Sequence, residues 1–180
     1  MKAPFRFAVA FLLAAWSGGA APVANASQPP GRIEFVRPAL TGRVVDNANL
    51  LTPEQEARLT GRLAALERRT TDQLIVVTLP SLGGLTIEAV GLDLGNGWRI
   101  GQRGKDNGVL LIVAPNERRV RIEVGYGLEA ILTDARAAAI IEAIVPAFHH
   151  GRFPEGIEVG TQAIVATLVA HQGEPRRRQR

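Results

Sequence analysis

The chain has 180 residues, of which 46% are hydrophobic, no cysteine, and a formal net charge of +4 at pH 7. The lack of cysteine excludes a disulfide framework, a cysteine nucleophile and a cysteine-ligated zinc site. Two of the 21 Lys and Arg lie in the first six residues and four in the last five, which leaves 15 basic against 16 acidic residues between positions 27 and 172. Because this central part is close to neutral, we expect no nucleic-acid partner.

The first 26 residues have the features of a secretory signal peptide. Lys2 and Arg6 precede an apolar run over residues 7–16, and Ala24-Asn25-Ala26 matches a small-x-small cleavage pattern. The apolar run is shorter than the roughly 20 residues that span a bilayer. We therefore expect a secreted or periplasmic protein with no transmembrane helix in the mature chain, and an uncleaved N-terminal anchor is the alternative.

The rest of the chain is predicted to form one domain over residues 43–171. A proline-containing extended lead-in covers residues 27–42, and a basic disordered tail covers residues 172–180. Hydrophobic periodicity and turn residues predict, in chain order, a strand at 42–46, a helix from 53, a strand at 73–79, a helix at 87–98, strands at 109–114 and 120–124, and helices at 134–150 and 154–170. This order predicts an α/β fold, a three-layer α/β/α sandwich with a small mixed β-sheet.

Two local patterns support these elements. Thr52 is placed to cap the first helix, with Pro53 at its first position and Gln55 where a capping box has Glu or Gln. Residues 109–114 are continuously apolar and residues 119–124 alternate between charged and apolar, with a short turn-rich connection between them. We expect an antiparallel hairpin at this point.

Oxygen-bearing side chains follow or precede several of the predicted strands. The outer ends of an antiparallel hairpin lie side by side, so we expect a shared acidic rim. Carboxylates and carboxamides without His or Cys at ligand spacing favour Ca²⁺ or Mg²⁺ over zinc or copper. The candidate metal ligands are Asp46, Asp106, Asn107, Glu129 and Asp134, and the residues expected to line the same cleft are Arg99, Arg103 and Tyr126.

Each candidate ligand also has a structural interpretation. Asp134 is placed to cap the helix that it begins, residues 106–108 are typical of a turn, and Asp46 is placed to bond its own loop. Phosphatase chemistry is a second hypothesis, with Asp106 or Asp46 as the candidate nucleophile, or a metal-bound water in that role, and with Arg99 or Arg103 holding the phosphate. A metal-independent protein-interaction domain is a third.

Several short motifs, in this order and spacing, resemble those of the TPM-domain family. They are Val44-Val45-Asp46 with Asn49-Leu50-Leu51-Thr52, Trp98-Arg99-Ile100-Gly101, Asp106-Asn107-Gly108, Gly125-Tyr126-Gly127-Leu128-Glu129, Leu132-Thr133-Asp134, Pro146-Ala147-Phe148 and Gly151-Arg152-Phe153. The resemblance covers residues 43–170 and implies a sandwich with an acidic cleft. It also implies binding of calcium or another divalent cation, and an acid phosphatase activity known for plant members. For this chain we expect an accessory role at the cell envelope, with an envelope or membrane-protein partner.

Overall fold

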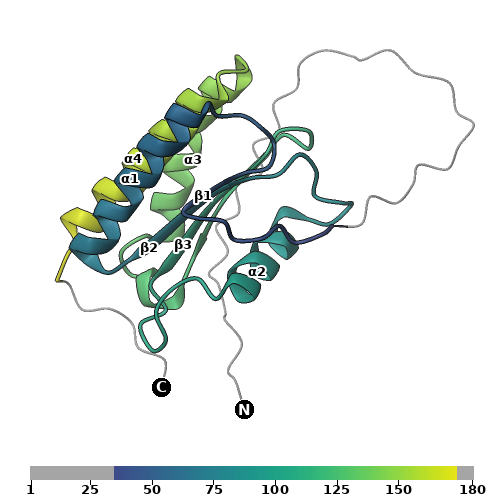
Figure 1. The fold of residues 1–180 in the computed structure, drawn as a ribbon. Coiled ribbons are helices and arrows are strands. Elements are labelled where there is room, and N and C mark those ends of the chain that lie inside the picture. The colour runs from purple at the N-terminus through teal and green to yellow at the C-terminus, as the bar shows by residue number, and fades with distance from the viewer. Residues whose placement is uncertain (1–34, 174–180) are drawn as a thin grey trace, which may run out of the picture.

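A four-stranded mixed sheet forms the middle layer of the protein (Figure 1). The computed structural model describes residues 35–173, so the predicted signal peptide and most of the predicted tail lie outside the described residues. The strands, in spatial order across the sheet, are β1 (Val44–Asp46), β2 (Gln73–Thr78), β3 (Gly108–Ala114) and β4 (Arg119–Val124). The first three strands run parallel, and β4 pairs antiparallel with β3 as the predicted hairpin.

Helices cover both faces of this sheet, which confirms the predicted three-layer sandwich (Figure 1). One face carries α1 (Pro53–Thr70), α3 (Asp134–His149) and α4 (Phe153–Ala170). The other face carries α2 (Ile87–Trp98), and a short 3₁₀ helix, η1 (Tyr126–Leu128), follows β4. No helix within residues 35–173 is long and apolar enough to cross a membrane.

The sheet is buried because successive residues of β3 face opposite helix layers. Val109 and Leu111 belong to the hydrophobic core under α1, α3 and α4, whereas Leu110 and Ile112 belong to the core under α2. All four side chains are at most 1% exposed. A strand that is buried on both faces has no wet side, and this explains its unbroken apolar sequence.

The helix starts follow from local capping. Thr52 accepts a hydrogen bond from the backbone N–H of Gln55, whose side chain accepts one in return from the N–H of Thr52, so the predicted capping box is present. Thr86 and Thr133 cap α2 and α3 in the same way, each accepting from the backbone three residues later. These caps determine where each helix begins at the rim of the sheet.

The strands begin and end at two opposite sides of the sheet, and we call these two sides its edges. The carboxyl ends of β1 and β2 lie side by side, and α1 begins near them, as does α4; we call residues 46–53 and 149–155 the helix-start edge. The opposite edge holds the starts of β2 and β3 and the end of β4; we call residues 99–107 and 125–134 the loop edge. Two residues on different edges are separated by the length of a strand.

Candidate functional site

The loop edge is held together by direct backbone contact between its two segments. The N–H of Gly127 donates to the carbonyl of Asp106 at 3.1 Å, and the N–H of Gly125 donates to the carbonyl of Gly108 at 2.7 Å. A Cβ atom at Gly125 would overlap the carbonyl oxygen of Asp106, and one at Gly127 would overlap that of Lys105. Glycine at both positions allows this approach, which places the acidic residues of the two segments on one edge.

Asp106 occupies an unusual position in this edge. Its backbone is left-handed, with φ of 48°, and its carbonyl accepts the hydrogen bond from Gly127. The side chain is half-buried, and among the interactions described for residues 35–173 its carboxylate takes part in no hydrogen bond or ion pair. The hydrogen bonds and ion pairs described for residues 35–173 therefore leave the carboxylate oxygens of Asp106 unused.

Asn107, by contrast, is committed to the protein. Its side chain is fully buried, its Oδ1 accepts from the N–H of Gln102 at 2.8 Å, and its Nδ2 donates to the carbonyl of Thr71 at 2.7 Å and to Oδ1 of Asp72 at 3.3 Å. This bonding ties the loop before β3 to the connection between α1 and β2. The turn interpretation describes Asn107 better than the metal-ligand one.

Asp72, which directly precedes β2 and contacts the loop edge through Asn107, is not among the residues that the sequence analysis singles out. It is 0% exposed and accepts from the amide of Asn107. Its only signal in the sequence is its place in a polar connection between a helix and a strand, where an aspartate is typical of a turn.

The other predicted residues of the cleft also lie on the loop edge. Glu129 follows η1 and is half-buried, and Asp134 is the exposed first residue of α3, next to the capping Thr133. Arg99 and Arg103 are exposed on the segment between α2 and β3. Tyr126, which begins η1, is half-buried.

Asp46 lies on the helix-start edge, and this corrects the expectation that all five candidate ligands share one rim. It pairs with Thr78 at the carboxyl ends of β1 and β2, whereas Asp106 precedes the start of β3. Its Oδ2 accepts from the N–H of Leu51 at 2.8 Å, and its Oδ1 accepts from the N–H of Leu50 at 3.1 Å and from the hydroxyl of Thr78. Both carboxylate oxygens are therefore used to close the loop that leads into α1.

The residues do not fit a single site in which these side chains surround one metal ion. Within residues 35–173 no three His, Asp or Glu side chains come close enough together to hold an ion. The reason is topological, since Asp46 is on the wrong edge and the amide of Asn107 is occupied on both sides. A cation at the loop edge would take few side-chain ligands and complete its coordination with carbonyl oxygens and water.

A buried ion pair lies away from both edges, under α2. Arg121 and Glu123 on β4 are 3% and 0% exposed, and Nε of Arg121 donates to Oε1 of Glu123. Nη1 of Arg121 lies 3.5 Å from Glu88 in the first turn of α2. Burial raises the pKa of Glu123 to about 6, against the opposing effect of the Arg121 guanidinium. Two of the alternating charges of β4 thus form a buried ion pair.

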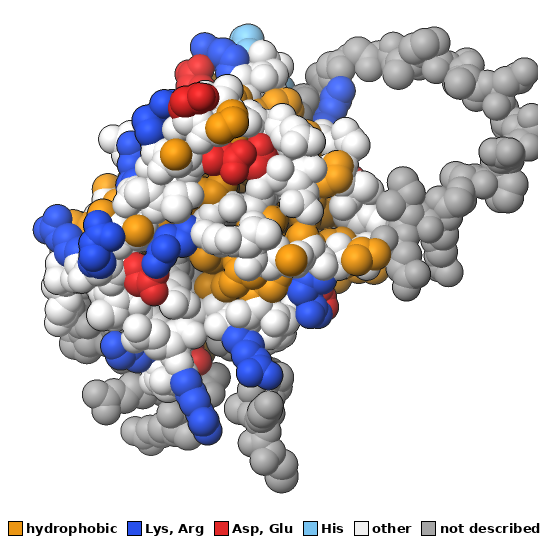
Figure 2. Space-filling view, viewed as in Figure 1, with side chains coloured by type: hydrophobic (Ala, Val, Ile, Leu, Met, Phe, Trp, Pro, Cys, Tyr) orange, Lys and Arg blue, Asp and Glu red, His pale blue; other side chains and the backbone are white. Residues whose placement is uncertain are grey.

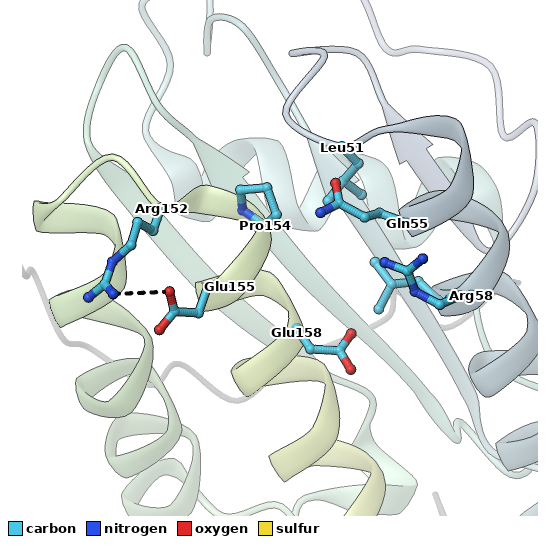
Figure 3. A pocket seen from close by; sticks show the side chains of 8 residues that line it. Leu51, Gln55, Arg58, Arg152, Pro154, Glu155 and Glu158 are labelled. Atoms are coloured by element: carbon cyan, nitrogen blue, oxygen red, sulfur yellow. Dashed lines mark ion pairs between the residues drawn. The ribbon is translucent and has the colours of Figure 1, made fainter.

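A pocket of about 510 Å³ opens at the helix-start edge, between the first turns of α1 and α4 (Figure 3). None of the sequence-based candidate residues lines it. The residues that line the pocket are Leu51, Gln55, Arg58, Leu59, Arg152, Pro154, Glu155 and Glu158. The sequence patterns do not indicate the pocket, because residues 71–152 separate α1 from α4 along the chain.

The fold is shared with known proteins. Residues 44–167 match the TPM domain, and the chain belongs to this family. The structure is similar to the N-terminal domain of a protein from P. gingivalis, with a TM-score of 0.69 and 36% sequence identity, covering 78% of this chain and 89% of that one.

Two further solved structures share the fold at lower identity. One is the N-terminal domain of a protein from Corynebacterium glutamicum, with a TM-score of 0.56 and 15% identity, covering 85% of this chain and 92% of that one. The other is a protein from the psychrophilic bacterium Bizionia argentinensis, with a TM-score of 0.60 and 20% identity, covering 71% and 86%. No curated protein matches the chain at a significant level.

Proposed function

We propose that this TPM domain is an exported binding module that takes up a divalent cation, Ca²⁺ or Mg²⁺, at the loop edge. The observation that supports the proposal is the carboxylate of Asp106, which is half-buried and engaged by no hydrogen bond or ion pair described for residues 35–173. Glu129 belongs to the neighbouring segment, which the backbone contacts of Gly125 and Gly127 hold against Asp106. Oxygen donors of this kind suit hard cations that retain part of their water shell.

The proposed role is accessory rather than catalytic. A cation that bridges the two segments of the loop edge would stabilise their arrangement and present a charged surface to an envelope or membrane-protein partner. Ligand that binds only the folded state raises the free energy of unfolding by about 2.7 kcal/mol at a concentration 100 times its dissociation constant. Cation binding is therefore expected to raise the melting temperature.

Calorimetric titration of the full chain with Ca²⁺ and Mg²⁺, after chelator treatment, tests this proposal. Saturable heat is expected from the parent protein, with a rise in melting temperature, and Asp106→Asn should lose most of both. Glu142→Gln is the matched control, because Glu142 is an exposed carboxylate on α3 away from the loop edge. The proposal fails if Asp106→Asn binds as the parent does, or if neither cation binds at millimolar concentration; a metal-independent interaction domain would then be favoured.

Hydrolysis of phosphomonoesters is the second candidate function. It is supported by the exposed guanidinium groups of Arg99 and Arg103, which share the loop edge with Asp106. Steady turnover of a generic phosphomonoester that Asp106→Asn abolishes would favour it, and turnover that survives this change would contradict a role for Asp106 as nucleophile.

A further inference from the structure

The pocket at the helix-start edge combines an apolar lining with charged groups. Leu51, Leu59 and Pro154 supply apolar surface from the loop before α1, from α1 and from α4. The two helices lie side by side with both first turns at the pocket (Figure 1, Figure 3). Over the side of the molecule where α1 and α4 lie, basic and acidic side chains are interspersed (Figure 2). The pocket therefore suits a ligand with one apolar part and one charged group.

The polar groups of the pocket differ in how far the protein already uses them. Glu158 pairs with Arg62, and Arg152 lies 3.3 Å from Glu155. Arg58 is exposed and forms no ion pair within 4 Å in the described part of the chain. The pKa of Glu54, one turn earlier, is lowered mainly by a hydrogen bond with Thr52 and least by the charge of Arg58. The pocket thus has one guanidinium without a carboxylate directly against it.

Gln55 stands one turn before Arg58 and faces the same space (Figure 3). Its Oε1 accepts from the N–H of Thr52 in the capping box, at 2.8 Å. Because that bond fixes the oxygen toward the backbone, the amide nitrogen is left as a donor. Arg58 and Gln55 together offer several N–H groups from one face of α1.

We propose that the pocket binds a carboxylate attached to an apolar group, with Arg58 and Gln55 donating to the carboxylate and Leu51, Leu59 and Pro154 contacting the apolar part. A planar carboxylate matches the two parallel N–H groups of a guanidinium. A single negative charge balances the one guanidinium that lacks a direct partner. A phosphate dianion fits less well, because Glu155 and Glu158 also line the pocket and would repel the second charge.

The same chemistry has two sources, a small carboxylic acid or the free C-terminus of a peptide. The site is independent of the proposed cation site, since it lies on the other edge of the sheet. Asp46 acts here as a positioning residue, because its carboxylate holds the N–H of Leu51 and so fixes one wall of the pocket.

NMR titration of the full chain tests the proposal with three probes: 4-methylpentanoate, the peptide acetyl-Ala-Ala-Leu with a free carboxylate, and the same peptide with an amidated end. Either 4-methylpentanoate and the peptide with a free carboxylate, or that peptide alone, should shift the resonances of the pocket residues. A response to both identifies a small acid as sufficient, and a response to the peptide alone identifies a peptide C-terminus. The proposal is overturned if the amidated peptide binds as tightly as the acid, or if neither acid binds at millimolar concentration.

Variants then locate the site. Arg58→Gln should weaken binding of the acid probe by about tenfold or more, as expected for loss of a charge-assisted bidentate contact. Arg68→Gln is the matched control, an exposed arginine in the last turn of the same helix, and should bind as the parent does. Equal binding by Arg58→Gln and the parent would overturn the assignment of Arg58, and unchanged binding in Asp106→Asn would separate this site from the loop edge.

Discussion

The two edges of the sheet each carry an aspartate next to a strand, but the two carboxylates differ in their hydrogen-bond partners. At the helix-start edge Asp46 accepts from two backbone N–H groups and from the hydroxyl of Thr78. At the loop edge the carboxylate of Asp106 has no such partner in the described part of the chain, while its backbone carbonyl is bonded to Gly127. A carboxylate at a strand end is thus a candidate ligand only where nearby N–H groups do not already occupy its oxygens.

The edges also differ in what holds them together. The loop edge relies on glycines that let two backbones meet, and the helix-start edge relies on the side chain of Asp46. Substitutions at these positions should therefore damage one edge and leave the other intact.

The largest effect is expected at Gly127. In Gly127→Ala the new methyl group would overlap the carbonyl of Lys105, and the backbone cannot yield without opening the loop edge. We expect a loss of about 2–4 kcal/mol in the free energy of unfolding, measured as a lower urea midpoint at unchanged slope.

Gly61 provides the control for this change. It lies in α1 with nothing within 4 Å of a Cβ atom, so Gly61→Ala should stabilise the protein by about 0.5–1 kcal/mol. A loss at Gly127 no larger than a few tenths of a kcal/mol would show that the two segments of the loop edge are not held in contact.

Asp46→Ala should have a somewhat smaller effect on stability and none on cation binding. Loss of a carboxylate that accepts three hydrogen bonds is expected to cost about 2 kcal/mol, and Asp46→Asn, which keeps one carbonyl oxygen, should cost less. The heat of calcium binding, measured by calorimetric titration, should stay as in the parent protein. If Asp46→Asn removed calcium binding from a folded protein, the separation of the two edges would be refuted.

Glu123 belongs to neither edge, and its titration makes the free energy of unfolding depend on pH without any ligand. Its pKa in the folded protein, about 6, is raised above its usual 4.5 by burial. The contribution of Glu123 to the free energy of unfolding is therefore fully present below about pH 4.5 and is lost as the pH rises through 6. This loss lowers the free energy of unfolding by about 2 kcal/mol.

Urea unfolding at several pH values should show this loss in the parent and not in Glu123→Gln, which cannot ionise. Taking the difference between the two proteins cancels the contributions of the other titrating groups. Parallel pH profiles for the two proteins would contradict the raised pKa of Glu123.

The local part of the fold was predictable because its causes are local. The capping box of Thr52 and Gln55 and the continuous apolar run of β3 each determine an element through neighbours a few residues away. The predicted hairpin of β3 and β4 put Asp106 and Glu129 on the same edge, because the outer ends of an antiparallel pair lie side by side. The antiparallel pairing of the two strands agrees with this.

The candidate sites were less predictable, because they depend on contacts between distant segments. Asp46 could not be assigned to an edge without knowing that β1 runs parallel to β2. The burial of the Arg121 and Glu123 ion pair could not be predicted either, because the alternation of β4 does not reveal that α2 covers this face.

The helices, the strands and their layering could be predicted because capping, periodicity and burial on two faces leave patterns in runs of adjacent residues. The oxygens that remain available and the place where a pocket opens depend instead on contacts between distant segments. Gln55 and Arg58 meet Pro154 and Glu158 there because α1 and α4 pack side by side with their first turns together. No local sequence pattern predicts that these residues line one pocket, because their proximity depends on the strand directions and helix packing of the whole domain.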